Sequence, residues 1–480
     1  MFNDFKELAN FIKANNILIV DFKEIDLDGR WHHLTIPAER FNESILKKGI
    51  GFDGSSYGFL SVEKSDMVFI PDITTAFVDP CVDIPTLTMI GDIYKINGNY
   101  ERFENDPRYV SSKAEAYMSD CGVSDRCLFG PEFEFYILDN VEFKNDMNHM
   151  EVRLDSAQSH WNTMDSPYDP PDNNKGYKVM HHKGYHADLP YDITFDLRNE
   201  MVRTLEDNGI PVKYHHSENG GPGQVEIEVN FATLTEMGDR TQKLKYFVKN
   251  IALQNGKTVT FMPKPFYGEA GSGMHVHFQM FNKGNPVFYD EKGYSCLSDT
   301  ALHAISGILK HSASLMAFSN PSTNSYKRLV PGYEAPVTIC FATANRSSVI
   351  RIPGYAIAPE DKRFEFRPGD ATCNPYLAYS AIAMAAMDGI LNKLDPSALN
   401  FGPYDKNMYN LTEEEKSKIK SLPKSLDEAA EALEKDHDYL LSGGVFTKGL
   451  IADQLKKIKK DAEEVSIVPH PIEFKKYYDL

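Results

Sequence analysis

The sequence lacks the short signatures by which several enzyme classes are recognised. Its 480 residues contain no G-x-x-x-x-G-K-[ST] loop, and no G-x-G-x-x-G segment follows an expected strand. The H-E-x-x-H pair of zinc proteases is also missing. If the protein binds a nucleotide, it does so outside the P-loop and protein-kinase designs.

Cysteine, long apolar runs and excess positive charge are scarce as well. The six cysteines form no C-x-x-C pair and no zinc spacing, which favours a reducing, cytoplasmic compartment. The most apolar long run, residues 376–387, is too short to span a bilayer, and residues 1–8 lack the apolar core of a signal peptide. A formal charge of −18 argues against a nucleic-acid or anionic-membrane surface.

The most informative feature that is present is an alternation of charge within apolar segments. Four runs that otherwise read as buried strands carry an ionisable side chain at every second position: residues 132–135, 224–229, 274–278 and 363–367. Each strand then has an apolar face and a face lined by acid, imidazole or guanidinium. Because isolated charges avoid the interior unless they are paired or bind a metal, the four strands predict one shared polar cavity.

The ionisable groups on these strands fit a divalent metal. The set is four carboxylates and one imidazole: Glu132, Glu134, Glu226, Glu365 and His275. Such hard oxygen donors suit Mg²⁺ or Mn²⁺ far better than zinc. Any single glutamate could equally occupy a solvated strand edge, and His275 and His277 alone would be read as packing residues. The set as a whole favours metal binding.

Arginines form a second cluster, in the C-terminal half. Five of them lie within 40 residues: Arg328, Arg346, Arg351, Arg363 and Arg367. A guanidinium fork binds phosphate or carboxylate oxygens bidentately, whereas a lone arginine in an acidic protein is usually a surface ion-pair partner. Arg363 and Arg367 flank Glu365 on one strand face, so cations and a metal-type carboxylate share one space. This combination indicates phosphoryl transfer.

The periodicity of the sequence predicts an α+β fold. An amphipathic helix over residues 4–15 precedes short β-type runs that continue to residue 94. Helical periodicity recurs at residues 108–121, 196–208, 234–255, 300–319, 376–394 and 425–464. We expect a small sheet-rich N-terminal domain and a larger one in which helices surround the acidic strands. The polar stretch at 139–183 predicts a surface excursion or lid.

Several segments match, in order, the motifs of a known family. They are Phe52-Asp-Gly-Ser-Ser56, Gly130-Pro-Glu-Phe-Glu134, Phe261-Met-Pro-Lys-Pro265, Gly271-Ser-Gly-Met-His275 and the block from Asn320 to Pro336. On these motifs the chain resembles type I glutamine synthetase over nearly its whole length. The resemblance implies ATP-dependent ligation of glutamate and ammonia. ATP would first convert the γ-carboxylate into γ-glutamyl phosphate, which ammonia would then attack.

By position, the resemblance implies two divalent ions, Mg²⁺ or Mn²⁺, in each active site. One ion would be held by Glu134, Glu218 and Glu226. The second, beside the ATP phosphates, would be held by Glu132, His275 and Glu365. Glu218 enters only through the resemblance, and Glu228, which alternates like the others, is interpreted as structural.

The resemblance also implies roles for the remaining polar residues. Nucleotide binding would fall to His277, Arg346, Arg351 and Arg363. Glutamate binding would fall to Gly271, Arg328, Glu334 and Arg367. The implied catalytic residues are Asp53, Ser56, Tyr185, Glu334 and Arg346. Asp53 would take a proton from ammonium, which has no lone pair for attack, and Glu334 would sit on a flap over that pocket.

At the level of architecture, the resemblance implies a β-grasp-like domain over residues 1–105 and a catalytic domain over residues 106–480. An antiparallel sheet in the catalytic domain would form a funnel-shaped active site surrounded by helices. The N-terminal domain would complete the active site of a neighbouring subunit in a dodecamer of two hexameric rings. The expected partners are therefore glutamate, ammonium, ATP and copies of the chain, with no nucleic acid and no membrane.

The chain departs from the family pattern beside the expected substrate pocket. Ala270 replaces the asparagine that usually precedes Gly-Ser-Gly-Met-His, and residues 185–190 differ from the usual Tyr-Phe-Pro-Val-Pro-Pro. The nearest alternative is therefore a ligase that joins glutamate to an organic amine such as a polyamine. A non-catalytic scaffold or nitrogen sensor would require the loss of metal or phosphate groups, and the sequence has lost none.

Two segments resemble the subtype that is regulated by adenylylation. Residues 140–183 match its insertion in length and at Asn174-Lys-Gly176, and Asn407-Met-Tyr409 resembles its modified-tyrosine loop. An ordinary exposed tyrosine is the alternative for Tyr409, because related unmodified enzymes also carry tyrosine there.

Overall fold

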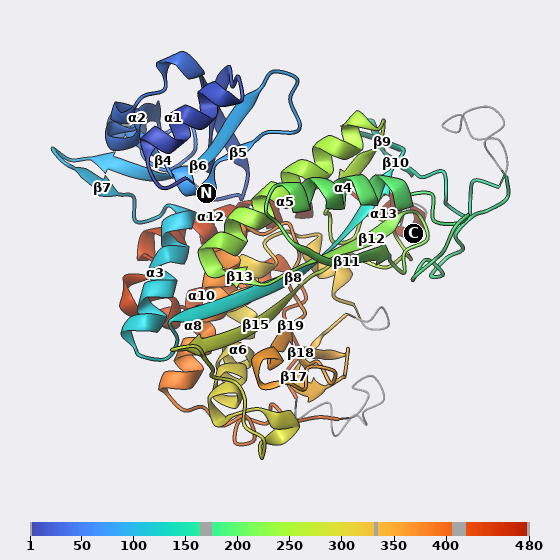
Figure 1. Ribbon diagram of the computed structural model, residues 1–480. Coiled ribbons are helices and arrows are strands. Elements are labelled where there is room, and N and C mark those ends of the chain that lie inside the picture. The colour runs from blue at the N-terminus through green and yellow to red at the C-terminus, as the bar shows by residue number, and fades with distance from the viewer. Residues whose placement is uncertain (1, 164–174, 331–334, 406–418, 478–480) are drawn as a thin grey trace.

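The computed structural model describes residues 2–163, 175–330, 335–405 and 419–477. Figure 1 shows the N-terminal part, in blue, at one end of the molecule and strand β8 running through the middle of the larger part. Among the described residues, no helix is both long enough and apolar enough to cross a membrane.

The N-terminal part is one sheet backed by a helix. Helix α1 (Phe5–Ala14) begins after Asp4, whose side chain accepts a hydrogen bond from the Glu7 amide at 2.8 Å. Buried Leu8 on this helix joins Phe22 and Phe69 of the sheet in one apolar cluster. Besides α2 (Glu43–Lys48), the elements are β1 (Ile19–Ile25), β2 (Trp31–Pro37), β3 (Ile50–Asp53), β4 (Asp66–Pro71), β5 (Phe77–Val78), β6 (Thr86–Ile96) and β7 (Tyr100–Arg102). The strand order is β2-β1-β6-β4-β3, with β5 and β7 also paired to β6.

The larger part is built on a ten-stranded sheet of order β11-β12-β8-β15-β19-β18-β17. Its strands are β8 (Arg126–Leu138), β11 (Val212–Ser217), β12 (Gln224–Val229), β13 (Ala232–Thr233), β14 (Thr258–Thr260), β15 (Met274–Asn282), β16 (Asn285–Pro286), β17 (Thr338–Thr343), β18 (Ser348–Ile352) and β19 (Phe364–Phe366). The pairing is antiparallel except between β17 and β18, which are parallel. The expected antiparallel sheet is thus present with one parallel pair at its edge.

Helices surround this sheet. They are α3 (Pro107–Asp120), α4 (Phe195–Asp207), α5 (Leu234–Gln254), α6 (Asp299–Ser319), α7 (Ser325–Arg328), α8 (Pro375–Leu391), α10 (Leu426–Lys435), α11 (Asp438–Leu441), α12 (Lys448–Ser466) and α13 (Pro471–Tyr477). Helix α8 is apolar on all sides and buried, as expected for a central helix. It packs on α6 where Gly307 faces Gly389; a Cβ on Gly307 would lie 2.1 Å from the Ala385 carbonyl oxygen.

The apolar face of β8 anchors the sheet to these helices. Phe129 stacks on Tyr379 of α8 with ring centroids 5.2 Å apart, and Phe135 packs against Phe261 at 5.0 Å. Phe133 is fully buried on the same face. Because side chains alternate along a strand, this packing forces Glu132 and Glu134 to the opposite face. The core therefore fixes which way the acidic groups point.

One buried arginine connects the two parts of the molecule. The guanidinium of Arg108, on α3, donates to Asp239 of α5 at 3.0 and 3.1 Å. It also donates to Asp92 and Asp72 of the N-terminal part, both at 2.8 Å. Three carboxylates around one buried cation hold that part against the catalytic helices.

The structure confirms the α+β fold, and the helices expected over 4–15, 108–121, 196–208, 234–255, 300–319 and 376–394 are present within a few residues. The segment expected as one polar excursion from residue 139 instead begins with a hairpin, β9 (Asn140–Asp146) and β10 (His149–Asp155). Both strands carry apolar residues at every second position, Val141 and Phe143 on β9 and Met150, Val152 and Leu154 on β10, so an alternation signal was available in the sequence. The apolar face is not covered: Phe143 and Val152 are 79% and 70% exposed. Residues 164–174 of the expected lid lie outside the described residues.

Candidate active site

The acidic strands converge as the alternation predicts. In the register of the sheet, Glu134 of β8 lies opposite Glu226 of β12, and Glu132 lies opposite His275 of β15. On the far side of β15 come β19 and then β18, where Glu365 of β19 lies opposite Arg351 of β18. These groups lie on one face of five neighbouring strands, and all of them except Glu365 line a cavity of about 460 Å³.

Glu132, His275 and Glu365 form the first candidate metal set. Nδ1 of His275 lies 3.0 Å from Oε2 of Glu132 and 3.6 Å from Oε1 of Glu365. One ligand atom from each residue lies within 4.8 Å of the other two. Such a spacing fits a single divalent ion, and a set of two carboxylates and one imidazole fits Mg²⁺ or Mn²⁺.

Hydrogen-bond donors and an arginine keep the two carboxylates of this set ionised in spite of their burial. Burial would raise the pKa of Glu132, but hydrogen bonds from His275 and His277 hold that pKa well below its usual range. Burial likewise opposes the charge on Glu365, yet Arg367 and the two imidazoles lower its pKa to about 2. Both carboxylates are therefore ready to bind a cation at neutral pH.

Glu134, Glu218 and Glu226 form the second set, on the other side of β8. Burial and the charges of Glu134 and Glu226 raise the pKa of Glu218 to about 8. Burial and the surrounding glutamates also raise the pKa of Glu226 well above its usual range. Carboxylates this crowded need a counter-ion to ionise together, so the donor set fits a divalent cation.

His216 is a member of this second set that the sequence analysis missed. Its Nε2 lies 3.4 Å from Oε1 of Glu226, and a ligand atom of Glu218 is also within 4.8 Å. His216 and Glu226 are opposite each other in the register of β11 and β12. A signal was available: the His215-His216 pair belongs to a β-type run that ends beside Glu218.

Four of the five clustered arginines line the cavity: Arg328, Arg346, Arg351 and Arg367. Arg351 donates to Oε2 of Glu365 at 2.6 Å, and Arg367 makes a short bond to Oε1 of the same carboxylate. Arg328 is fixed by the Pro368 carbonyl at 2.8 Å, and its Nη2 lies 3.1 Å from Nε2 of His275. Burial lowers the pKa of Arg328 below its usual value, although a guanidinium stays charged at neutral pH.

Arg363 and His277 lie behind the cavity wall and are not among its lining residues. Arg363 donates to the Asp361 carbonyl at 2.9 Å and stacks over Phe231 and Tyr355. His277 is fully buried, with its Nε2 2.9 Å from Oε1 of Glu132. In this arrangement the contact with His277 fixes the carboxylate of Glu132 in the first metal set.

Glu228 continues the alternation without reaching the cavity. Its Oε1 accepts from Lys213 at 2.7 Å, and the side chain is fully buried. An ion pair to lysine gives this carboxylate a counter-charge of its own, which agrees with its interpretation as a structural residue.

Gly271, Ala270 and Tyr185 also line the cavity. A Cβ on Gly271 would lie 2.7 Å from Cγ of Arg328, so this glycine leaves room for the arginine. The main-chain carbonyl of Ala270 accepts from the Tyr136 hydroxyl at 2.5 Å. Ala270, which departs from the family motif, therefore lines the cavity, and so does Tyr185, which begins the other departing segment.

Asp53 and Ser56 lie elsewhere, in the loop after β3 of the N-terminal part. The hydroxyls of Ser55 and Ser56 donate to the Asp53 carboxylate, each at 2.7 Å, and lower its pKa to about 2. Both Asp53 and Ser56 are exposed and are absent from the lining of the cavity. Within a single chain the structure does not bring them to the metal sets. Glu334 lies outside the described residues.

The chain is similar along its whole length to known proteins. Residues 16–96 match the glutamine synthetase β-grasp domain, and residues 104–477 match the glutamine synthetase catalytic domain. Glutamine synthetase from Streptomyces filamentosus is 44% identical over 483 residues and covers 100% of both chains. The enzyme from Mycobacterium tuberculosis (strain CDC 1551 / Oshkosh) is 44% identical, with 99% of this chain and 98% of that protein covered.

A solved structure gives the same result at the level of the fold. The structure of Plasmodium falciparum glutamine synthetase superposes with a TM-score of 0.88 at 28% identity, covering 99% of each chain. The β-grasp part, the helix-covered sheet and the acidic cavity define an ATP-dependent carbon–nitrogen ligase that uses divalent metal. The chain belongs to the glutamine synthetase family.

Proposed function

We propose that the cavity makes glutamine from glutamate, ammonia and ATP through γ-glutamyl phosphate. The observation that carries this proposal is the meeting of two acidic metal sets with four arginines in one cavity of about 460 Å³. A carboxylate is a poor electrophile, so it must be activated before an amine can attack. Phosphoryl transfer to the γ-carboxylate supplies that activation, and metal ions with arginines are the groups that stabilise such a transfer.

The ions in this proposal are Mg²⁺ or Mn²⁺. Glu132, His275 and Glu365 would hold one, and the second would be held by Glu134, Glu218 and Glu226 with His216 beside them. When bound, the ions neutralise phosphate charge and polarise the transferring group. The side chains of the protein hold the reactants in position.

Arginines divide the remaining charge between the two substrates. Arg346 and Arg351 would contact the phosphates of ATP, with Arg363 and His277 behind them. Arg328 and Arg367, next to Gly271, would hold the carboxylates of glutamate. The γ-carboxylate oxygen then forms a bond to the γ-phosphorus, and ADP leaves. Arg346 stabilises the charge of the transferring group.

The second half-reaction needs a base that the single chain does not place in the cavity. Asp53, with Ser56, would reach the cavity from a neighbouring subunit and take a proton from ammonium. Ammonia, beside Tyr185 and under the Glu334 segment, would attack the acyl carbon and release phosphate. The low pKa of Asp53 keeps it ionised to bind the ammonium cation.

This sharing of residues requires an oligomer, for which we propose a dodecamer of two hexameric rings. A domain boundary between residues 105 and 106 would separate the donor part of each subunit from its own catalytic part. We also propose that the protein belongs to the adenylylation-type subtype, with Tyr409, outside the described residues, as the modified residue. Incubation with an adenylyltransferase and ATP, followed by mass spectrometry of the wild type and Y409F, tests that assignment.

The amine assay is the central test. Purified protein is incubated with ATP, Mg²⁺ and glutamate, and ADP release is measured with ammonium or with putrescine. We expect ADP and glutamine with ammonium. The alternative is a γ-glutamyl-amine ligase, which remains worth testing because Ala270 and Tyr185 line the cavity. ADP release with putrescine and none with ammonium would identify that activity and refute the proposal.

A further inference from the structure

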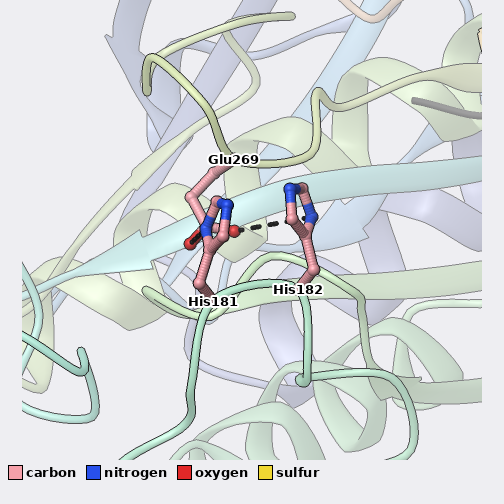
Figure 2. Close-up of side chains that lie close together, drawn as sticks. All are labelled: His181, His182 and Glu269. Atoms are coloured by element: carbon pink, nitrogen blue, oxygen red, sulfur yellow. Dashed lines mark hydrogen bonds and ion pairs between the residues drawn. The ribbon is translucent and has the colours of Figure 1, made fainter. Parts of the chain in front are cut away.

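A histidine pair just before Tyr185 lies beside a buried glutamate, and the proposed reaction uses none of the three. Figure 2 shows the imidazoles of His181 and His182 rising side by side from one loop toward Glu269, which reaches them from a separate segment. Nδ1 of His181 lies 2.6 Å from Oε1 of Glu269, and Nδ1 of His182 lies 4.0 Å from Oε2. One ligand atom from each residue lies within 4.8 Å of the other two.

The backbone accounts for how two consecutive side chains reach one carboxylate. Successive residues of an extended chain point to opposite sides. His182 has φ 55°, a left-handed conformation that non-glycine residues rarely adopt. This turn brings its ring to within 3.9 Å of the His181 ring, measured between centroids. Both imidazoles therefore face Glu269.

Glu269 is a buried charge at the base of this cluster. The carboxylate is 3% exposed, whereas the side chains of His181 and His182 are 51% and 30% exposed. Its Oε2 also accepts from the Gly221 amide at 3.3 Å, and Lys264 donates to its main-chain carbonyl. The buried carboxylate thus lies against two imidazoles that solvent can reach.

We propose that His181, His182 and Glu269 bind a transition-metal ion of the zinc class. Two imidazoles and one carboxylate are a recognised zinc donor set, with a fourth position left for water. Ligand atoms around a tetrahedral zinc are about 3.3 Å apart. The observed separations of 2.6 and 4.0 Å lie on either side of that value, so small side-chain rotations seat an ion. The imidazole content separates this site from the carboxylate-rich catalytic sets.

The position of the site gives the ion a structural effect. The loop of His181 and His182 leads directly to Tyr185, and Glu269 precedes Ala270 and Gly271. Both segments line the cavity. An ion that joins them would fix the wall that faces the amine. This effect on the pocket rests on the proposed function, but the binding of the ion does not.

The test is a metal titration of the full-length protein. Chelator-treated protein is supplied with excess Mg²⁺ to fill the oxygen-rich sites and is then titrated with Zn²⁺ by calorimetry, with Co²⁺ absorption as a second probe. The variants H181N and H182N change side chains that are 51% and 30% exposed, so we expect folding to be retained, and circular dichroism verifies it. H149N is the matched control, because His149 also pairs with a glutamate, Glu151 at 3.1 Å, but belongs to no three-ligand group among the described residues.

We expect the wild type and H149N to bind one more Zn²⁺ per chain than H181N or H182N, or to bind it at least about tenfold more tightly. The Co²⁺ spectrum of the wild type should show the strong visible bands of a tetrahedral site, and those bands should weaken in both variants. Equal Zn²⁺ stoichiometry and affinity in all four proteins would overturn the proposal. Such a result would leave ADP release with ammonium, and thus the proposed function, untouched.

Discussion

Glu365 connects the metal chemistry with the phosphate chemistry at the scale of a single residue. Its two oxygens bind Arg351 and Arg367, while His275 of the first metal set lies 3.6 Å away. The variant E365Q removes the charge but keeps the shape. Because one metal ligand is lost and two buried guanidinium groups lose their counter-charge, we expect Mn²⁺ affinity and turnover each to fall by about 100-fold or more. Calorimetry and steady-state kinetics measure the two effects.

The control for E365Q is E228Q. Glu228 is equally buried and alternates in the same way, but it pairs with Lys213 at 2.7 Å, lies 4.0 Å from His277 and is not one of the three residues of the first metal set. We expect turnover of E228Q within about tenfold of the wild type, with some loss of stability from the broken ion pair. If E365Q kept full activity and tight Mn²⁺ binding, the assignment of the first metal set would be wrong.

The raised pKa of Glu218 predicts how metal binding depends on pH. Metal ligands bind as carboxylates, so an ion must displace the proton that Glu218 holds below about pH 8. For each proton displaced, Mn²⁺ affinity should rise about tenfold per pH unit between pH 6 and 8. Calorimetry in two buffers of different ionisation enthalpy measures the protons released. Affinity that stays flat over this range would contradict the crowding of the second set.

The stability of the metal-free protein should fall as pH rises, whereas the affinity for Mn²⁺ should increase. The folded state holds the Glu218 proton up to about pH 8, whereas an unfolded glutamate releases it near pH 4.5. The folded state thus binds more protons in this window, and the contribution of Glu218 to stability falls as pH rises. Saturating Mn²⁺ should cancel the decline. Thermal unfolding at several pH values, with and without Mn²⁺, measures it.

Site residues could be predicted from the sequence pattern where they lie on a regular strand, and not where they lie in a loop. Glu132, Glu134, Glu226, Glu365 and His275 lie on strands, where alternation fixes the face, and the structure brings all five together. Glu218 follows the end of β11 in a turn, where no periodicity applies, and only the family motif identified it. Asp53 and Ser56 were also assigned by the family motif, but the structure of a single chain does not show which subunit's cavity they enter.

At the scale of elements, the segment that enters β15 shows how tightly the backbone is fitted to the substrate arginine. A Cβ on Gly273 would lie 2.4 Å from Nη2 of Arg328 and 2.8 Å from Nε2 of His275. In G273A these two side chains must move. We expect KM for glutamate to rise by about tenfold or more, since Arg328 loses its position. We also expect kcat to fall, because His275 of the first metal set is displaced. Initial rates over a glutamate series measure both.

G449A is the matched control for this substitution. Gly449, at the start of α12, would place its Cβ 3.6 Å from its nearest neighbours, which is an ordinary contact. We expect wild-type kinetics and unchanged or slightly higher stability, because alanine favours a helix. A normal KM for glutamate in G273A would argue that Arg328 does not bind this substrate.

Elements were predictable where a local signal agreed with the core. Helix α8 is marked by an uninterrupted apolar run and the Asn374 cap, and it lies at the centre of the molecule. The β9–β10 hairpin alternates apolar and polar residues, but no core covers its apolar face, so the local signal and the packing did not agree. The position of α3 against the N-terminal part depends on Arg108 and three aspartates distant in sequence, which no local pattern reveals.

For the whole molecule, the separation of Asp53 from its own cavity predicts complementation between subunits. D53A lacks the proposed base, and E365Q lacks a metal ligand; each protein alone should be nearly inactive. Mixed subunits should form some sites from the intact N-terminal part of E365Q and the intact catalytic part of D53A. Random one-to-one mixing should restore about a quarter of the wild-type activity.

The mixing experiment requires co-expression or reversible dissociation, so that subunits exchange. Mass photometry of the mixture verifies that oligomers form. The control is a mixture of D53A with a double variant, D53A combined with E365Q, in which no intact site can arise. Activity no greater than the sum of the parents, in oligomers that have exchanged subunits, would show that Asp53 serves its own chain or has no role.

The carboxylates gathered along β8 and β12 also influence how long each copy of the protein lasts. A chain that folds before it captures its ions must either keep Glu218 and Glu226 protonated or bury carboxylate charge without a counter-ion, and the second cost favours opening of the sheet. Proteases cut opened chains, so unloaded copies should be removed faster than loaded ones. The supply of divalent ions would then set the abundance of the protein as well as its turnover.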